Sequence, residues 1–235
     1  GLSQMEMNEG YQERDDPGLT VRFPLVDRPG ESLLVWTTTP WTLPANVAAA
    51  VHPEQRYVRI RQGADVHWVG RGTLKKAVVG DFRVEEERPG ADLVGWRYTG
   101  PYDDLPAVRA AFAAGTRDDP SRPYEHRVVA WDEVGEDEGT GIVHVAPGAG
   151  AEDFQLGKGL GLPVIGPIDE DGRYFEGYDW LSGRDAPNVA EAVVDDLQRR
   201  GFFYHLEPYR HRYPHCWRCG TALLFRLVDE WFISM

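Results

Sequence analysis

The sequence is poor in several features that mark common protein classes. Its 235 residues include two cysteines, too few for the disulfide framework of a small secreted domain. It has no apolar run long enough to span a membrane and no charged-then-apolar signal peptide at its start. We therefore expect a soluble cytoplasmic protein that makes no contact with a membrane.

Basic residues are scarce relative to acidic ones. Lysine and arginine number 25 against 38 aspartates and glutamates, which gives a formal net charge of −13. A protein that grips nucleic acid by neutralising phosphates needs a basic surface, so this balance argues against strong nucleic-acid binding by the chain alone. Hydrophobic residues make up 42% of the sequence, enough for one large domain with a real core.

Familiar motifs for catalysis and phosphate binding are missing as well. The sequence contains no G-x-x-x-x-G-K-[ST] and no complete G-x-G-x-x-G. It also contains no G-x-S-x-G and no H-E-x-x-H. A conventional triad hydrolase or metal-dependent hydrolase is therefore disfavoured.

The hydrophobic pattern predicts an α+β, mostly-β fold. After a polar lead-in over residues 1–18, short runs rich in Val, Ile, Tyr and Trp are separated by Gly, Pro and Asp, a pattern typical of strands. The predicted strands are Leu19–Val26, Ser32–Thr38, Asn46–His52, Tyr57–Arg61, Val66–Val69, Phe82–Glu86, Arg127–Trp131 and Ile142–Val145. Helices are predicted over Val108–Ala114, from near Ala151, and over Pro187–Arg200. We expect a barrel-like closed sheet with flanking helices.

The first segment that suggests chemistry is Trp36–Asn46, which reads W-T-T-T-P-W-T-L-P-A-N. Hydroxyls and unpaired N–H groups at a strand end can bind an ester or a ribose. Threonines alone are equally typical of a solvent-facing strand end. The two tryptophans and two prolines around them favour a rigid pocket lining.

A second segment, Gly139–Phe154, runs from a strand through His144 into a loop of small residues, and a helix begins near Asp153. Taken alone, Asp153 is expected to interact with the helix N-terminus, and His144 to be a hydrogen-bonded core residue.

The third segment is Cys216-x-x-Cys219, half of a structural zinc site. We expect no complete metal site in this chain; the alternative is a set completed by His211 and His215.

Together these segments closely resemble the editing insertion of the class I isoleucyl-tRNA synthetases. The motifs that carry the resemblance are, in order, Asp16-Pro17, Val21–Leu25, Trp36–Asn46, Val51–Pro53, Gly95–Pro101, Gly139–Phe154, Tyr213–Cys219 and Trp231–Ile233. The valyl and leucyl relatives resemble T-T-R-P at the threonines and carry Lys or Met in place of His144. Thr39, Trp41 and His144 therefore favour the isoleucyl branch, with a valyl or leucyl relative as the alternative. The H-x-G-H and K-M-S-K-S signatures of synthetic activity are missing.

The resemblance implies an editing domain over residues 19–204, with residues 205–235 returning toward the synthetic core of the same polypeptide. Its implied activity is hydrolysis of valyl-tRNA(Ile), and of valyl-adenylate as a further candidate substrate. A pocket for isoleucine cannot strongly reject valine, because one methylene is worth roughly 1–3 kcal/mol, and these synthetases are the standard example of that limit. A non-catalytic, zinc-ribbon-like binding module is the competing hypothesis.

The resemblance also implies roles for individual residues. Asp153 would pair with the α-ammonium of the substrate, and His144 would line the side-chain pocket and reject isoleucine. Thr37, Thr38 and Thr39 would bind the carbonyl, the terminal ribose and the attacking water. The remaining roles fall to Asn46, which would orient that water, and to Trp36 and Trp41, which would form pocket walls near the 3′ end of the tRNA. Editing would need no cofactor, although the complete enzyme is a candidate for a structural zinc.

Overall fold

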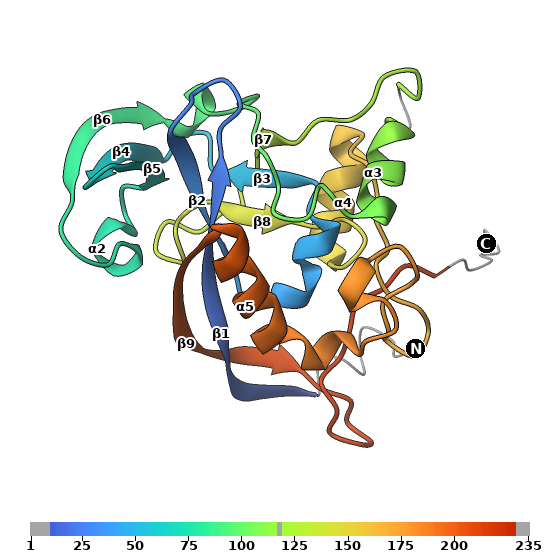
Figure 1. The fold of residues 1–235 in the computed structure, drawn as a ribbon. Coiled ribbons are helices and arrows are strands. Elements are labelled where there is room, and N and C mark those ends of the chain that lie inside the picture. The colour runs from blue at the N-terminus through green and yellow to red at the C-terminus, as the bar shows by residue number, and fades with distance from the viewer. Residues whose placement is uncertain (1–9, 117–118, 229–235) are drawn as a thin grey trace, which may run out of the picture.

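The structure, a computed structural model, describes residues 10–116 and 119–228. In these residues nine strands form one curled sheet (Figure 1). They are β1 (Tyr11–Pro24), β2 (Glu31–Thr37), β3 (Ala48–Val51), β4 (Arg56–Gln62), β5 (Asp65–Gly70), β6 (Arg83–Pro89), β7 (Arg127–Ala130), β8 (Val143–Val145) and β9 (Phe203–Pro214). The helices are α2 (Leu74–Ala77), α3 (Pro106–Ala113), α4 (Ala151–Leu160) and α5 (Ala190–Arg200).

Strand β2 is the branch point of the sheet. Along one edge it pairs antiparallel with β1. Along the other edge its first residues pair parallel with β5, and Trp36 near its end pairs parallel with Val143 of β8. The sheet therefore divides into two wings, one formed by β5, β4 and β6 and the other by β8, β3 and β7 (Figure 1).

Strand β2 is buried on both faces, which explains its continuous apolar run. Leu33 and Val35 point into the main core, whereas Leu34 lies in a smaller core beneath α2. A strand covered on both sides loses the alternation of polar and apolar residues. After this run burial decreases: Thr37 is still buried, whereas Thr38 and Thr39 are partly exposed.

The predicted class is confirmed: the chain is mostly β, its sheet curls as a half-barrel, and helices flank it. Each predicted strand has an observed counterpart, and so do the helices predicted over 108–114 and from 151. The helix predicted to begin at Pro187 starts later. A 3₁₀ turn, Ala186–Asn188, contains that proline, and α5 begins at Ala190. None of the helices in the described part of the chain has the length and apolar content that a membrane span requires.

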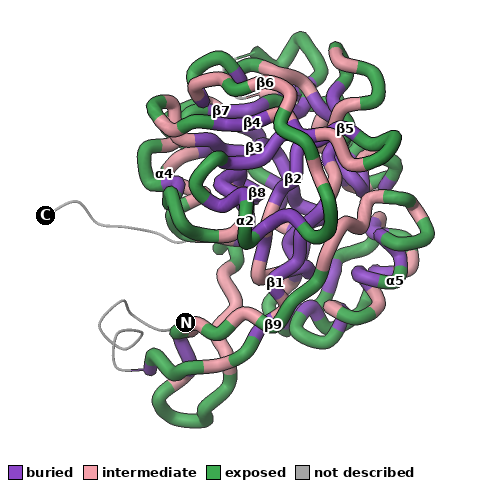
Figure 2. Tube along the Cα trace, turned by 90° about the vertical axis from the view of Figure 1, so that its left-hand side faces the viewer, coloured by how far each residue is buried: buried purple, intermediate pink, exposed green. Residues whose placement is uncertain are grey.

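The lead-in and the return segment are more ordered than the sequence pattern indicates. Within the polar lead-in, residues 11–18 form the first half of β1 and are held by antiparallel pairing with β9. The main-chain N–H and C=O groups of each segment hydrogen-bond with those of the other, which lies about 190 residues away along the chain. Figure 2 shows the two strands running together out of the buried body. Residues 1–9 and 229–235, including the Trp231–Ile233 motif, lie outside the described residues.

Candidate functional site

The threonine segment and the loop after β8 face each other across a small cavity. Strands β2 and β8 are parallel neighbours, so their carboxyl ends lie at the same edge of the sheet. The cavity there has a volume of about 200 Å³. Its lining residues are Trp36, Thr37, Thr38, Thr39, Thr42, Val143, His144, Ala146, Ala149, Gly150 and Asp153. Drug-sized ligands occupy about 300–1,000 Å³, so this volume suits a much smaller group such as an amino-acid side chain.

The threonines form a connected row of hydroxyl groups. Pro40 starts a 3₁₀ helix, Pro40–Ala45, which turns the chain away from β2 immediately after Thr39. The N–H of Thr39 donates to Thr37 Oγ1 at 3.1 Å, and the Oγ1 atoms of the same two residues lie 3.4 Å apart. Thr42 Oγ1 follows 3.3 Å from Thr39 Oγ1. The row presents several polar groups to one ligand without using a charged side chain.

Asp153 stands in the first turn of α4. Its Oδ2 accepts the N–H of Ala146 at 2.7 Å, which ties the helix to the loop after β8. Burial raises the pKa of this carboxyl to about 6, against the lowering effect of that hydrogen bond. A buried acid of this kind is stabilised in its ionised form by a cation that enters the cavity.

His144 is a neutral wall of the cavity. Its Nε2 lies 2.9 Å from Thr42 Oγ1, and its Nδ1 lies 2.7 Å from Asn46 Nδ2. Burial lowers the pKa of the imidazole to about 3, so the ring carries no charge at neutral pH. With both ring nitrogens engaged, His144 contributes its shape to the cavity rather than a proton.

Two predicted site residues lie away from the cavity. Asn46 is buried behind His144, where its amide bonds that imidazole and the carbonyl of Ala48. The geometry therefore gives Asn46 no direct contact with a water in the cavity. Trp41 lies on the inward side of the 3₁₀ helix, is 7% exposed and belongs to the main core. The predicted pocket wall at Trp41 is thus a core contact.

Trp36 does line the cavity, and residues outside the cavity hold its ring in position. Its ring packs edge-on against Tyr209 of β9, with ring centroids 4.9 Å apart. A Cβ added at Gly139 would lie 2.5 Å from the indole, so this glycine makes room for the ring. Thr42 also lines the cavity, although it was not among the predicted site residues. Its three-residue spacing from Thr39 is a signal for a shared face of a 3₁₀ turn.

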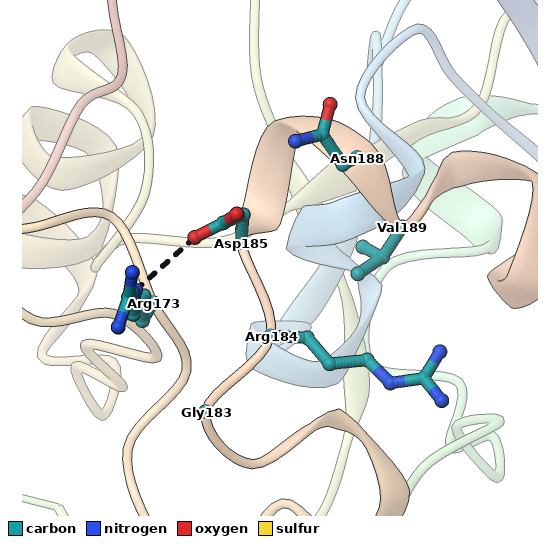
Figure 3. A pocket seen from close by; sticks show the side chains of 6 residues that line it. All are labelled: Arg173, Gly183, Arg184, Asp185, Asn188 and Val189. Atoms are coloured by element: carbon teal, nitrogen blue, oxygen red, sulfur yellow. Dashed lines mark hydrogen bonds and ion pairs between the residues drawn. The ribbon is translucent and has the colours of Figure 1, made fainter.

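A larger surface cleft lies elsewhere and has different chemistry. Figure 3 shows this cleft of about 430 Å³, lined by Arg173, Gly183, Arg184, Asp185, Asn188 and Val189. Its side chains include an exposed ion pair between Arg173 Nε and Asp185 Oδ1 at 3.2 Å. It shares no residue with the threonine cavity. It also lacks a buried titratable group, which makes it the weaker candidate for catalysis.

The two cysteines lie in a turn just after β9. Cys216 N–H donates to the carbonyl of Thr221, and Gly220 N–H donates back to the carbonyl of Cys216, both at 2.8 Å. His211 Nε2 lies 2.8 Å from an Asp16 carboxylate oxygen, and His215 hydrogen-bonds a backbone carbonyl. Across residues 10–116 and 119–228, no group of three or more His, Cys, Asp or Glu side chains is placed to hold a metal. The alternative of a Cys₂His₂ set is therefore not supported there.

Comparison with known proteins identifies relatives along the whole chain. No protein-family model matches. The chain is 38% identical over 241 residues to isoleucine–tRNA ligase of Pyrococcus horikoshii, covering 100% of the chain and 22% of that protein. It is 39% identical over 243 residues to the Pyrococcus furiosus ligase, with the same coverage. It is also 36% identical over 232 residues to isoleucine–tRNA ligase 2 of Bacillus cereus, covering 99% and 21%. The chain thus spans about a fifth of the length of these relatives.

Solved structures share the fold at low sequence identity. The crystal structure of GlLeuRS-CP1 matches with a TM-score of 0.59 and 15% identity, covering 84% of this chain and 100% of that one. The cytosolic leucyl-tRNA synthetase editing domain of P. knowlesi matches with a TM-score of 0.56 and 9% identity, covering 85% and 97%. The curled sheet with its flanking helices is therefore common to all three chains.

Proposed function

Since the chain belongs to the isoleucine–tRNA ligase family and has the fold of a class I synthetase editing domain, we propose that it hydrolyses valyl-tRNA(Ile). One observation carries the proposal. An acid in a largely dehydrated setting and a row of threonine hydroxyls meet in one cavity of about 200 Å³. An aminoacyl ester offers the matching groups, an ammonium beside an ester carbonyl.

Asp153 anchors the substrate by its α-ammonium. Burial holds the pKa of the free carboxyl near 6, and an ammonium within about 4 Å favours the ionised form and lowers that pKa again. The Ala146 N–H keeps one carboxylate oxygen in place. The anchor thus sets the distance between the α-carbon and the threonine row.

The threonines position the ester and the attacking water. An aminoacyl ester is already activated, so a water held in the correct geometry attacks without a strong base. Thr37, Thr38 and Thr39 line the cavity, and their hydroxyl groups are the donors for the negative charge that develops on the carbonyl oxygen. The titratable residues that line the cavity are His144, which forms its wall, and Asp153, which binds the ammonium. Neither is available as a base to activate a threonine hydroxyl as a nucleophile. Hydrolysis therefore proceeds with no covalent intermediate.

Discrimination against isoleucine is by size. The imidazole of His144, held at both nitrogens, and the side chain of Val143 bound the cavity opposite the threonines. A rigid wall excludes one additional methylene more sharply than a mobile one, because mobile side chains repack around it. Valyl-adenylate carries the same ammonium and acyl group, and it is a second substrate under this proposal.

The acidic charge of −13 restricts how tRNA is held. This chain takes only the 3′ end of tRNA(Ile), and the rest of a full-length cytoplasmic ligase provides most phosphate contacts. Trp36 is the lining residue suited to stack on a terminal base. Binding of tRNA to this chain alone is expected to be weak and sensitive to salt.

The test is deacylation of valyl-tRNA(Ile) and isoleucyl-tRNA(Ile) by the full-length protein. Wild type should hydrolyse the valyl ester much faster. Asp153→Asn keeps the acceptor for the Ala146 N–H but removes the charge, and it should abolish most activity. Glu152→Gln is the matched control, because it neutralises the exposed acid next in sequence and should leave the rate unchanged. Equal rates on both esters would refute the function, and a near-normal rate for Asp153→Asn would return Asp153 to a structural role.

We also propose that Cys216 and Cys219 supply half of a structural zinc site in the full-length protein. The fit rests on their turn, in which two main-chain hydrogen bonds between Cys216 and the residues just after Cys219 hold both thiols on one short loop. Thiolates at this spacing suit zinc, and two further ligands must come from another part of the protein. Metal analysis after dialysis should show one zinc fewer per chain in a full-length Cys216→Ser, Cys219→Ser double variant than in wild type.

A further inference from the structure

A chain of hydrogen bonds connects the buried Tyr98 to the threonine cavity. Tyr98 Oη donates to Asn46 Oδ1 at 2.7 Å. Asn46 Nδ2 lies 2.7 Å from His144 Nδ1, and His144 Nε2 lies 2.9 Å from Thr42 Oγ1. Thr42 Oγ1 then donates to the carbonyl oxygen of Thr39 at 2.8 Å. Neither Tyr98 nor Asn46 lines the cavity, and the lining residue that the Asn46 side chain contacts is His144.

The donors and acceptors along this chain can be assigned from its two ends. Burial raises the pKa of the Tyr98 phenol well above its usual value, so the phenol keeps its proton and donates. The carbonyl of Ala48 only accepts, and it lies 3.0 Å from Asn46 Nδ2. The carbonyl of Val145 also accepts from Asn46 Nδ2, at 3.4 Å. Together the phenol and the two carbonyls orient the Asn46 amide with its NH₂ group toward His144.

The imidazole of His144 is then restricted to one tautomer. Because Asn46 donates to Nδ1, that nitrogen is bare and the single ring proton of the neutral imidazole is on Nε2. The Nε2–H donates to Thr42 Oγ1, which leaves the hydroxyl proton of Thr42 free for the Thr39 carbonyl. If the amide rotated, His144 would carry its proton on Nδ1, and Thr42 would have to release Thr39 to donate to Nε2.

The ring of Tyr98 is held tightly at the far end of this chain. It stacks between Phe23 and His126, with centroid distances of 4.9 and 4.7 Å and interplanar angles of 20° and 22°. His126 is itself fixed at both nitrogens, by the Val47 carbonyl at 2.9 Å and an Asp103 carboxylate oxygen at 2.7 Å. The phenol is therefore a rigid reference point for the amide.

We propose that Tyr98 is a positioning residue for size discrimination, which acts through Asn46 to hold His144 in one orientation and one tautomer. This inference rests on the proposed function. Without the phenol, the Asn46 amide oxygen loses its donor, and only the carbonyls of Ala48 and Val145 still oppose rotation of the amide. The His144 ring then samples both tautomers, the Thr42 link to Thr39 loosens, and the cavity wall yields to the longer side chain of isoleucine.

The experiment compares Tyr98→Phe with Tyr124→Phe in the full-length protein. Phenylalanine fills the same stacked space as Tyr98 and removes only the hydroxyl. Tyr124 is the matched control, because it is also buried and its phenol donates to the Val47 carbonyl at 3.1 Å, which is not part of the hydrogen-bond chain from Tyr98 to Thr39. Deacylation of valyl-tRNA(Ile) and isoleucyl-tRNA(Ile) is measured for each variant. Imidazole ¹⁵N spectra of the 235-residue chain report the tautomer of His144, assigned by the signal missing in His144→Gln.

In wild type, His144 should show a bare Nδ1 and a protonated Nε2. In Tyr98→Phe the two ¹⁵N shifts should move toward each other. The ratio of valyl to isoleucyl deacylation should fall about 2- to 12-fold, the equivalent of ~0.5–1.5 kcal/mol for one buried hydrogen bond, chiefly because isoleucyl-tRNA is hydrolysed faster. Tyr124→Phe should change neither quantity.

The proposal requires both changes, so an unaltered tautomer or an unaltered ratio in Tyr98→Phe overturns it. An equal loss of both rates also overturns it, because that result assigns Tyr98 to the general integrity of the site. Failure of the proposed function is visible separately. A wild-type protein that does not hydrolyse valyl-tRNA(Ile) refutes the function before any variant is compared.

Discussion

The buried His67 should make the stability of this protein depend strongly on pH. His67 lies on β5, is 2% exposed, and neither ring nitrogen has a hydrogen-bond partner within the described residues. Its ring packs edge-on against Tyr204 at 5.4 Å. Burial lowers the pKa of the imidazole to about 4, aided by the positive charge of Arg22 and opposed by Asp65. The folded state therefore holds His67 neutral.

The direction and size of the effect follow from this pKa. The unfolded chain binds the proton near pH 6.5 and the folded chain only near pH 4, so the unfolded state is favoured as pH falls through this window. The full loss of stability is about 3 kcal/mol below pH 4, and it reaches about 2 kcal/mol at pH 5. His144 contributes in the same direction and Asp153 in the opposite one. The contributions of His144 and Asp153 are the same in wild type and in a variant at residue 67, so they cancel when the two proteins are compared.

The variants are His67→Phe and His67→Leu, and the measurement is urea unfolding followed by tryptophan fluorescence at several pH values from 7.5 to 5. The two variants differ in packing, so their free energies of unfolding at pH 7.5 will differ. Both lack the titrating group, and each should gain about 2 kcal/mol relative to wild type between pH 7.5 and pH 5. A difference that stays constant across this range would refute the assignment of His67 as a buried neutral imidazole.

Three further predictions concern the cavity and its supports. Thr42→Val removes the hydroxyl that joins the imidazole to the threonine loop, and should cost ~1–3 kcal/mol in urea unfolding and slow valyl-tRNA deacylation. Gly148→Ala would place a Cβ 1.8 Å from the carbonyl oxygen of Ile165 and should lower the melting temperature, whereas Gly159→Ala, with open space around it in α4, should stabilise by ~0.5–1 kcal/mol. Finally, kcat/KM for deacylation should fall as pH drops below about 6, because protonated Asp153 cannot pair with an ammonium; a flat profile from pH 7 to 5 would contradict that pairing.

Local pattern predicted the strands of the two wings and of β2, and it missed the pairing of the first half of β1 with β9. The run Leu33–Val35 and the alternation in β4 are signals of burial, which is a property of single segments. The paired halves of β1 and β9 form an exposed two-stranded ribbon, with polar residues on most positions. Their stability comes from main-chain hydrogen bonds to each other across about 190 residues of sequence. No local window contains that information.

For the cavity, too, some features could be predicted from the sequence and others depended on the tertiary structure. The order of its motifs along the sequence was sufficient to predict that the threonines, His144 and Asp153 act together. Their meeting depends on the parallel pairing of Trp36 with Val143, which places the two strand ends at one edge. The sequence could not separate Trp36 from Trp41, because both flank the threonines. The 3₁₀ turn after Thr39 decides between them by directing Trp41 into the core.

The sequence by itself thus determined the family resemblance, the mostly-β class and the residue types of the site. Only the tertiary structure decided which of those residues reach the cavity and which support it from behind. It places Asn46 behind His144 rather than at the cavity, brings Thr42 into the cavity lining, and joins Tyr98 to Asn46 by a hydrogen bond. The physical reason is that hydrogen-bond partners and burial depend on contacts between segments 50 to 100 residues apart. Such contacts exist only once the sheet has curled.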